Sequence, residues 1–447
     1  MDRKITFIYS NESKCWSQKQ FSRQPQVQYN LELENEYQKM EGFGGCFNEL
    51  GWLALSHLSQ NKREEVLDEL FSSDKANINF CRLPIGANDY SVDWYSLDEV
   101  DGDYDLEHFS IERDKKCLVE YIKSALKYNP DIKLFASPWS PPTWMKYPKV
   151  YNWGKLAQTP EVLNSYALYL ARFVQEYEKE NIKIHQVHVQ NEPVANQKFP
   201  SCMWTGEELR DFIKDYMGPT FEKLNMDSEI WLGTINAPGC DYKRLIFDKF
   251  ATEDYDYFAN TVLSDPDALK YIKGVGYQWG GKFAIQRTFE SWWPQIRLMQ
   301  TENECGFGDN TWEYSRYNFT MLKHYISNGA EAYMYWNLAL LPRGTSTWGD
   351  DQNAMITIDD KTGEVIYNPD FYLMKHFSSA VKRGAVRLGA RGPWAGDTLA
   401  FGNPDGEIVL VTMNPFKEQR MMNLKLEDNI YSFELEPQSF NTIRLSR

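Results

Sequence analysis

The sequence lacks both a strongly basic run and a long hydrophobic stretch. Of its 447 residues, 48 are Lys or Arg and 63 are Asp or Glu, which gives a formal net charge of −15. A groove that binds nucleic acid needs a basic stripe, and a membrane span needs about 20 consecutive apolar residues. We therefore expect neither nucleic-acid binding nor a membrane span.

Motifs for disulfides, metals and phosphates are also missing. The seven cysteines, at positions 15, 46, 81, 117, 202, 240 and 305, form no C-x-x-C pair, which is typical of reduced, mostly buried thiols. The six histidines include no H-E-x-x-H motif, and neither G-x-S-x-G nor a glycine-rich phosphate loop occurs. The first ten residues, MDRKITFIYS, contain no apolar secretory segment. We expect no metal, no organic cofactor and a cytoplasmic location.

Aromatic residues, by contrast, are abundant. The chain has 15 Trp, 27 Tyr and 25 Phe, together 15% of its residues. A large aromatic core would use many of them, but Trp is seldom fully buried, and rings that line a cleft stack on the apolar faces of sugars. Because many of these rings fall at the ends of predicted strands, the composition favours a carbohydrate-binding cleft.

Eight short apolar runs alternate with helical segments along most of the chain. The clearest helical spacing of apolar residues lies in the segment 160–180, which carries its charges on the other face. Eight such alternations over about 300 residues predict a (β/α)8 barrel. The predicted strands are 40–46, 78–86, 132–140, 184–192, 229–237, 271–279, 296–304 and 332–340.

The two chain ends do not follow this alternation. Short strand-like segments separated by turn residues fill 383–447, which is typical of antiparallel sheet, and the segments 4–10 and 27–34 are also strand-like. We expect these ends to pair with each other. The predicted architecture is a (β/α)8 TIM barrel at residues 39–382 with an antiparallel β-sandwich built from both chain termini, residues 1–38 and 383–447.

Acidic residues stand at the ends of the fourth and seventh predicted barrel strands. Glu192 precedes Pro193 at the end of strand four, and Glu302 or Glu304 ends strand seven. Barrel enzymes build their active sites at this edge, and glycosidic cleavage uses one carboxyl group as acid and another as nucleophile. Strands four and seven lie on opposite sides of a small barrel, so the two groups can face each other. The alternative is that these are two unrelated surface glutamates. Their shared position at strand ends disfavours that alternative.

Seven stretches in consistent order resemble glycoside hydrolase family 30, which includes glucocerebrosidase. They run from about residue 41 to about residue 387 and read EGFGGCFNE, FCRLPIGANDYS, FASPWSPPTWMK, VQNEP, TENECG, YWNLAL and FYLMKHFS. That family has a side β-domain assembled from both termini, in agreement with the strand pattern above. The resemblance implies a retaining enzyme with its acid/base and nucleophile on strands four and seven.

The resemblance also implies roles for the residues around these carboxylates. Glu192 matches the general acid/base and Glu302 the nucleophile. Asn191 matches the asparagine that bonds the sugar 2-hydroxyl, a contact that strengthens in the transition state. Asp89 matches a carboxylate that grips hydroxyl groups of the terminal sugar.

Three further residues match the family around the site, and two residues depart from it. Arg82 matches an arginine that helps to keep the nucleophile ionised. Trp139 and Trp336 match ring walls of the sugar subsite, for which ordinary barrel packing is the alternative. Gln278 stands where glucocerebrosidase has a histidine, so the identity of the substrate stays open. Glu304 is an extra acidic residue that shares a strand face with the nucleophile candidate and rivals it by pattern alone.

We expect a retaining, exo-acting β-glycosidase that hydrolyses a terminal β-linked glucosyl unit through a covalent glycosyl-enzyme. The expected substrate is a small β-glycoside or oligosaccharide. An endo-β-1,6-glucanase or a β-xylosidase is the alternative among enzymes, because the family spans these substrates. A non-catalytic carbohydrate-binding barrel is the alternative outside them. The paired carboxylates disfavour it, because sugar binding alone needs no matched acid and nucleophile.

Overall fold

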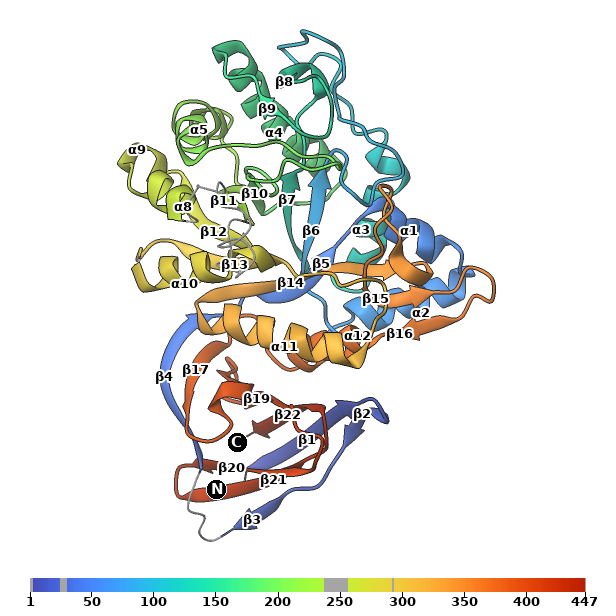
Figure 1. Cartoon of the computed structure of the whole chain (residues 1–447), viewed down its shortest axis with the longest axis vertical. Coiled ribbons are helices and arrows are strands. Elements are labelled where there is room, and N and C mark those ends of the chain that lie inside the picture. Colours follow the sequence, from blue (N-terminus) through green and yellow to red (C-terminus); the bar gives the residue numbers. More distant parts are fainter. Residues whose placement is uncertain (1–2, 25–29, 237–255, 292, 447) are drawn as a thin grey trace, which may run out of the picture.

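The computed structural model describes residues 3–24, 30–236, 256–291 and 293–446. Its upper part in Figure 1 is a closed barrel of parallel strands, in the order β13-β12-β11-β10-β7-β6-β5-β14, with β13 and β14 paired to close the ring. The strands are β5 (Gly42–Cys46), β6 (Phe80–Ile85), β7 (Lys133–Pro138), β10 (Gln186–His188), β11 (Glu229–Ile235), β12 (Ile272–Gln278), β13 (Arg297–Glu302) and β14 (Ala330–Leu340). The predicted barrel is confirmed, although position 237 of the fifth predicted strand lies outside the described residues.

The fourth barrel strand is shorter than predicted. β10 ends at His188, so the expectation that Glu192 closes this strand is wrong. Beyond His188 the backbone still pairs with β11, because the Glu192 amide donates to the carbonyl of Thr234 at 3.0 Å. Glu192 itself has a φ of 47°, in the left-handed region, and Pro193 follows without an N–H to donate. The chain therefore leaves the barrel in a turn that carries Glu192 above the strand end.

Two further strands extend the barrel sheet beyond the eight that the sequence predicts. β15 (Ala354–Ile358) pairs in parallel with β14, and β16 (Val365–Tyr367) pairs with β15 in antiparallel fashion. This hairpin lies outside the closed ring. A small two-stranded sheet, β8 (Lys146–Tyr147) with β9 (Lys155–Leu156), lies in the long connection after β7.

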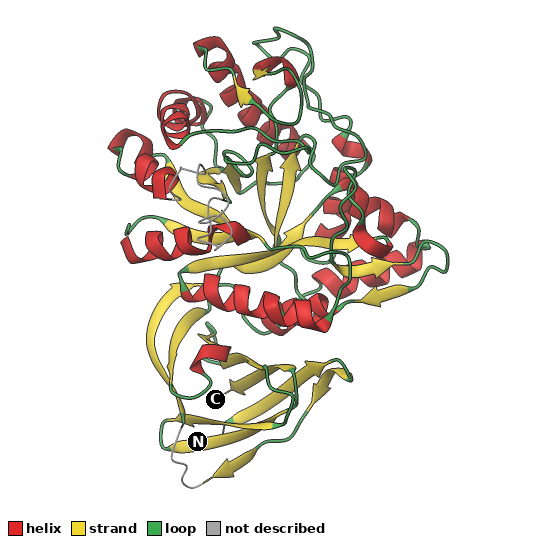
Figure 2. Ribbon diagram, in the orientation of Figure 1, coloured by secondary structure: helices red, strands yellow, loops and turns green. Residues whose placement is uncertain are grey.

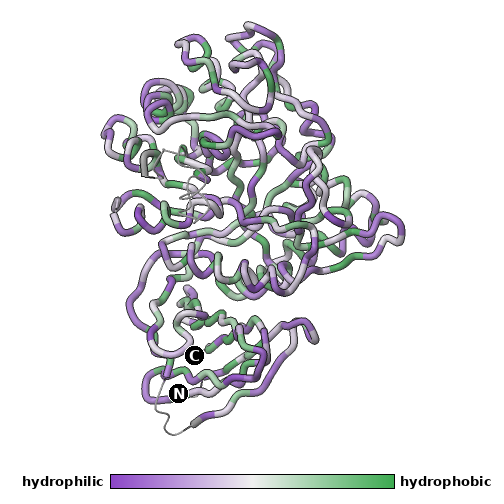
Figure 3. The backbone as a smooth tube through the Cα atoms, viewed as in Figure 1, coloured by the Kyte–Doolittle hydropathy of each residue, from purple (hydrophilic) through white to green (hydrophobic). Residues whose placement is uncertain are grey.

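Helices surround the barrel, as Figure 2 shows. In α4 (Pro160–Lys179), Thr159 caps the first turn by accepting from the Val162 amide, and Pro160 opens the helix. The peripheral helices alternate between green and purple in Figure 3, because one face of each packs on the strands and the other meets solvent. The others are α1 (Glu49–Ser56), α2 (Gln60–Phe71), α3 (Leu118–Leu126), α5 (Gly206–Phe212), α6 (Gly218–Lys223), α8 (Asp256–Leu263), α9 (Pro266–Leu269), α10 (Lys282–Ser291), α11 (Trp312–Ser327) and α12 (Pro369–Ser378).

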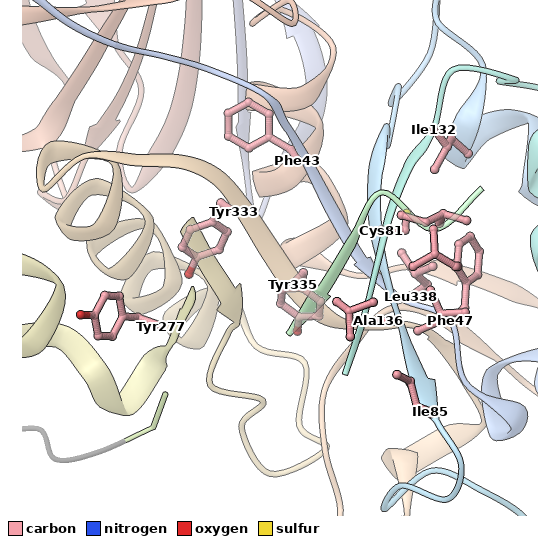
Figure 4. Packing of buried hydrophobic residues seen from close by; sticks show 14 of the residues in the cluster. Phe43, Phe47, Cys81, Ile85, Ile132, Ala136, Tyr277, Tyr333, Tyr335 and Leu338 are labelled. Atoms are coloured by element: carbon pink, nitrogen blue, oxygen red, sulfur yellow. The ribbon is translucent and has the colours of Figure 1, made fainter. Parts of the chain in front are cut away.

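The barrel strands are buried along most of their length. Their outward side chains, such as Tyr277, Tyr333 and Tyr335 in Figure 4, join the large core between strands and helices. A second buried cluster combines residues of β6, β7, β11, β13 and β14, which can meet only inside the ring: Phe80, Phe135, Trp231, Met299, Ala332 and Met334. The interior is therefore filled, and a substrate site is left to the carboxyl ends of the strands.

The lower part of Figure 1 is a β-sandwich that contains both chain ends. Its strand order is β2-β1-β22-β19-β18-β17-β4-β20-β21-β3, and Phe7, Leu31, Phe433 and Ile443 belong to its buried core. Strands from the two termini pair directly, β1 with β22 and β4 with β17. The strands are β1 (Lys4–Asn11), β2 (Lys14–Gln18), β3 (Ser22–Gln24), β4 (Leu31–Lys39), β17 (Val386–Arg391), β18 (Thr398–Gly402), β19 (Ile408–Asn414), β20 (Arg420–Leu426), β21 (Asn429–Leu435) and β22 (Ser439–Ser446).

Two sequence expectations concern the chain as a whole. Within the described ranges, no helix is both long enough and apolar enough to cross a membrane. The six described cysteines, at 15, 46, 81, 117, 202 and 305, are free thiols, and three of them are buried. Cys240 lies outside the described residues.

Candidate active site

A cavity of about 310 Å³ opens at the carboxyl ends of the barrel strands. Four acidic side chains line it, namely Asp89, Glu192, Glu302 and Glu304. Trp139 and Asn191 line it as well. The volume lies at the lower end of the range of roughly 300–1,000 Å³ that small-molecule sites occupy. The structure thus brings six of the residues predicted or weighed from the sequence to one hollow.

Glu302, the last residue of β13, is held by two donors. The Arg82 guanidinium forms an ion pair with its Oε2, and the Gln278 amide donates to the same oxygen at 2.9 Å. Arg82 is completely buried, so its charge acts with little screening by solvent. Glu302 is therefore the carboxylate whose immediate contacts favour the negative charge.

The same two donors, together with Thr234, fix the side chain of Asn191. Its Oδ1 accepts from Arg82 Nη2 at 2.6 Å, from Gln278 Nε2 at 2.7 Å and from Thr234 Oγ1 at 3.0 Å. With Oδ1 occupied in this way, the orientation of the Asn191 amide is set. Its NH₂ group remains as the donor for a ligand.

Two tryptophans flank the arginine. The Arg82 guanidinium carbon lies 4.3 Å from the ring centroid of Trp139 and 5.4 Å from that of Trp336, and the two ring centroids are 5.6 Å apart. Trp139 borders the cavity, whereas Trp336 lies behind it and also contacts Tyr90. The indole Nε1 of Trp336 is buried without a hydrogen-bond partner among the described residues. The rings thus position Arg82.

Asp89 follows β6 in the loop that opens the cavity. Its Oδ1 is buried and has no partner in the described part of the chain. Burial, and secondly the charge of Glu302, raise the pKa of Asp89 to about 7. An unpaired buried carboxyl oxygen is costly unless a ligand hydroxyl satisfies it.

The two catalytic candidates differ in their surroundings. Burial, followed by the charges of Glu302 and Asp89, raises the pKa of Glu192 to about 8. Burial also raises the pKa of Glu302, but there the Arg82 guanidinium opposes the effect both through its charge and through a hydrogen bond. Pairs of carboxyl groups whose environments differ in this way are typical of an acid and a nucleophile.

Glu304, the rival of Glu302 by sequence pattern, has a different environment. It lies two residues beyond the end of β13 and is only partly buried. Its Oε2 accepts a hydrogen bond from the hydroxyl of Tyr317 on α11. Arg82 pairs with Glu302 instead, so the structure distinguishes two carboxylates that the alternation of a strand could not separate.

Two members of the polar network were not predicted from the sequence. Ser137 Oγ accepts from both Nε and Nη2 of Arg82, at 3.1 and 2.8 Å, and the Thr234 hydroxyl lies between Arg82, Asn191 and Gln278. Single hydroxyl residues on strands carry no distinguishing pattern, so only the folded chain identifies them. In the described residues, no group of three His, Cys, Asp or Glu side chains is arranged to hold a metal ion.

The barrel, the sandwich and the acidic cavity together are those of a glycoside hydrolase. The family model described as "Glycosyl hydrolase family 30 TIM-barrel domain" matches residues 40–381, and the one described as "Glycosyl hydrolase family 30 beta sandwich domain" matches residues 384–443. The chain belongs to glycosyl hydrolase family 30. This confirms the resemblance seen in the sequence.

Individual relatives have two kinds of activity in their names. Lysosomal acid glucosylceramidase of Mus musculus is 29% identical over 87% of this chain and 77% of its own length. Endo-1,6-beta-D-glucanase of Neurospora crassa is 25% identical over 85% of this chain and 79% of its own length. Among solved structures, SrfJ from Salmonella typhimurium superposes with a TM-score of 0.88 at 26% identity and covers 99% of this chain and 100% of its own. The family is thus shown, while its members differ in substrate.

Proposed function

We propose that this protein is a retaining, exo-acting β-glycosidase that removes a terminal β-linked glucosyl unit from a small glycoside or oligosaccharide. The observation that carries the proposal is the shared cavity of Glu192 and Glu302, in which Arg82 forms an ion pair with Glu302 and, among the described residues, none with Glu192. A protein that only binds sugar has no need of two carboxyl groups in such unequal surroundings.

In the proposed mechanism the two glutamates act in turn. Glu302 attacks the anomeric carbon as the nucleophile, while Glu192 gives its proton to the departing glycosidic oxygen. The raised pKa of Glu192, about 8, keeps that proton available at neutral pH. Glu192 then removes a proton from a water molecule. The oxygen of this water attacks the anomeric carbon, and the bond between the sugar and Glu302 breaks. Two inversions restore the β configuration.

Two polar groups support the binding of the terminal sugar. Asp89 Oδ1, which has no partner in the described part of the chain, supplies an acceptor for its hydroxyl groups. The NH₂ group of Asn191, held by the contacts of its Oδ1, is the donor for the 2-hydroxyl. The Trp139 ring supplies an apolar face.

An endo-β-1,6-glucanase is the second candidate, and the Neurospora crassa relative favours it. The two candidates are separated by product analysis. An exo-acting enzyme releases only single sugars from a β-1,6-glucan and cleaves aryl β-glucosides, whereas an endo-acting enzyme produces oligosaccharides first. An aryl β-xyloside in the same assay tests the β-xylosidase alternative.

The mechanism is tested by azide rescue. Glu302→Gln should abolish turnover, because no glycosyl-enzyme forms. Glu192→Ala should still form the intermediate from an activated aryl glucoside, and azide should then restore its turnover and yield the β-glycosyl azide. Proton NMR identifies the anomer. An α-azide from the Glu192 variant, or full activity of the Glu302 variant, would overturn the assignment.

A further inference from the structure

The cavity has two halves that come from opposite sides of the barrel. Asp89 and Trp139 follow β6 and β7, whereas Trp279 and Glu304 follow β12 and β13. In the ring of eight strands, β12 is four places from β6 and β13 is four places from β7. The half that carries Asp89 is the proposed site of the terminal sugar, together with Glu302 at the end of β13. We assign the residues beyond Glu302 in the opposite half to the group that leaves.

Aromatic rings accompany Glu304 in this second half. Trp279, Phe307 and Tyr314 border the same cavity, and Phe307 is 79% exposed. Exposed rings at the edge of a cavity offer flat apolar faces on which a sugar ring can stack. They do not by themselves distinguish a sugar from a lipid chain.

The carboxylate of Glu304 supplies that distinction. The Tyr317 hydroxyl donates to Glu304 Oε2, and Tyr317 does not border the cavity. Lys282 Nζ in turn donates to the Tyr317 hydroxyl at 3.2 Å. No hydrogen bond to Oε1 is present among the described residues, so this oxygen remains as an acceptor. A carboxylate accepts from hydroxyl groups, is costly to cover with an apolar chain and repels an anion.

We propose that Glu304 is a specificity-determining residue of an acceptor subsite, where it accepts a hydrogen bond from a hydroxyl group of a second, neutral sugar. This deepens the proposed function and rests on it. The subsite selects a hydroxyl-rich leaving group over an acyl chain, because covering the Glu304 carboxylate with an apolar chain is costly. It also disfavours a uronic acid, because three further carboxyl groups line the cavity and repel an anion. The preferred substrate is thus a short β-linked oligosaccharide.

The experiment compares two substrates in matched variants. The kcat/KM for a β-1,6-linked diglucoside is divided by that for octyl β-glucoside, in the wild type and in the Glu304→Leu variant. Loss of a hydrogen bond to a charged group should lower this ratio by about ten- to a hundredfold. Tyr317→Phe should lower it by a smaller factor, because Glu304 loses its support. Glu313→Gln is the control, since Glu313 is exposed on α11 and does not border the cavity.

A binding measurement separates failure of this inference from failure of the proposed function. Calorimetry with the diglucoside in the Glu302→Gln background needs no turnover, and adding Glu304→Leu should weaken binding by about tenfold or more. An unchanged affinity, or an unchanged ratio of kcat/KM values, would refute the acceptor role of Glu304. A wild-type enzyme that cleaves no β-glycoside would instead refute the proposed function, and the binding result would still decide the role of Glu304.

Discussion

Replacing Glu192 with Gln should make the folded protein more stable at neutral pH. In the folded state the pKa of Glu192 lies at about 8, against an ordinary value of 4.5. A carboxyl group with a raised pKa adds stability below its unfolded pKa and loses that contribution as the pH rises towards its folded pKa. Between pH 4.5 and 7 the wild type should therefore lose about 1.4 kcal/mol per pH unit relative to the Gln variant, about 3 kcal/mol in all.

This free energy converts to a measurable change in Tm. An unfolding entropy of about 2.1 cal/mol/K per residue gives about 0.9 kcal/mol per degree for a chain of 447 residues. Calorimetry at pH 7 should therefore find the Tm of Glu192→Gln about 3 °C above that of the wild type, and the two should coincide near pH 4.5. Glu313→Gln, at an exposed position, is the control for loss of one charge. A constant Tm difference across this pH range, or a less stable Gln variant at pH 7, would refute the reasoning.

Two further predictions concern the pH profile and one concerns the sandwich. The kcat/KM for octyl β-glucoside, whose poor leaving group needs protonation, should fall above about pH 8, where Glu192 loses its proton, and a profile that stays flat to pH 10 would contradict its role as the acid. Gln278→Glu replaces a donor 2.9 Å from Glu302 with a second carboxyl group, so the acid side of the kcat/KM profile should move to higher pH; an unmoved profile would refute the contact. Phe7→Ala should cost about 3–5 kcal/mol and lower the Tm by several degrees, while kcat/KM at 25 °C stays within about twofold, because Phe7 is buried in the sandwich. An unchanged Tm would contradict that packing.

Much of the barrel could be predicted because its strands obey a simple physical rule. Strands of a closed parallel barrel are buried on both faces, so they occur as short, nearly continuous apolar runs between helices. β10 is shorter than the sequence predicts, because the extended backbone continues past His188 with irregular pairing to β11. The β15–β16 hairpin was missed, since it extends a sheet that was already complete with eight strands.

The candidate site was predictable only in part. Carboxylates at strand ends are found from position in the sequence, and the family resemblance supplied Arg82 and the tryptophans. The contacts that distinguish Glu302 from Glu304 depend on Arg82, which lies about 220 residues earlier in the chain. The hydroxyls of Ser137 and Thr234 join the network by proximity alone. Contacts between residues so far apart in the chain cannot be predicted from a local pattern in the sequence.

The pairing of β1 with β22 has a consequence for biosynthesis. Lys4 lies opposite Ser446, so β1 pairs with a strand that the ribosome makes about 430 residues later. At about 5–20 residues per second, translation of the intervening chain takes roughly 20–90 s. Throughout that interval the barrel residues can emerge and close, while β1 and β4 present unpaired edges to other nascent chains. Chaperones that shield β1 and β4 until β22 has been made should therefore raise the yield of native protein.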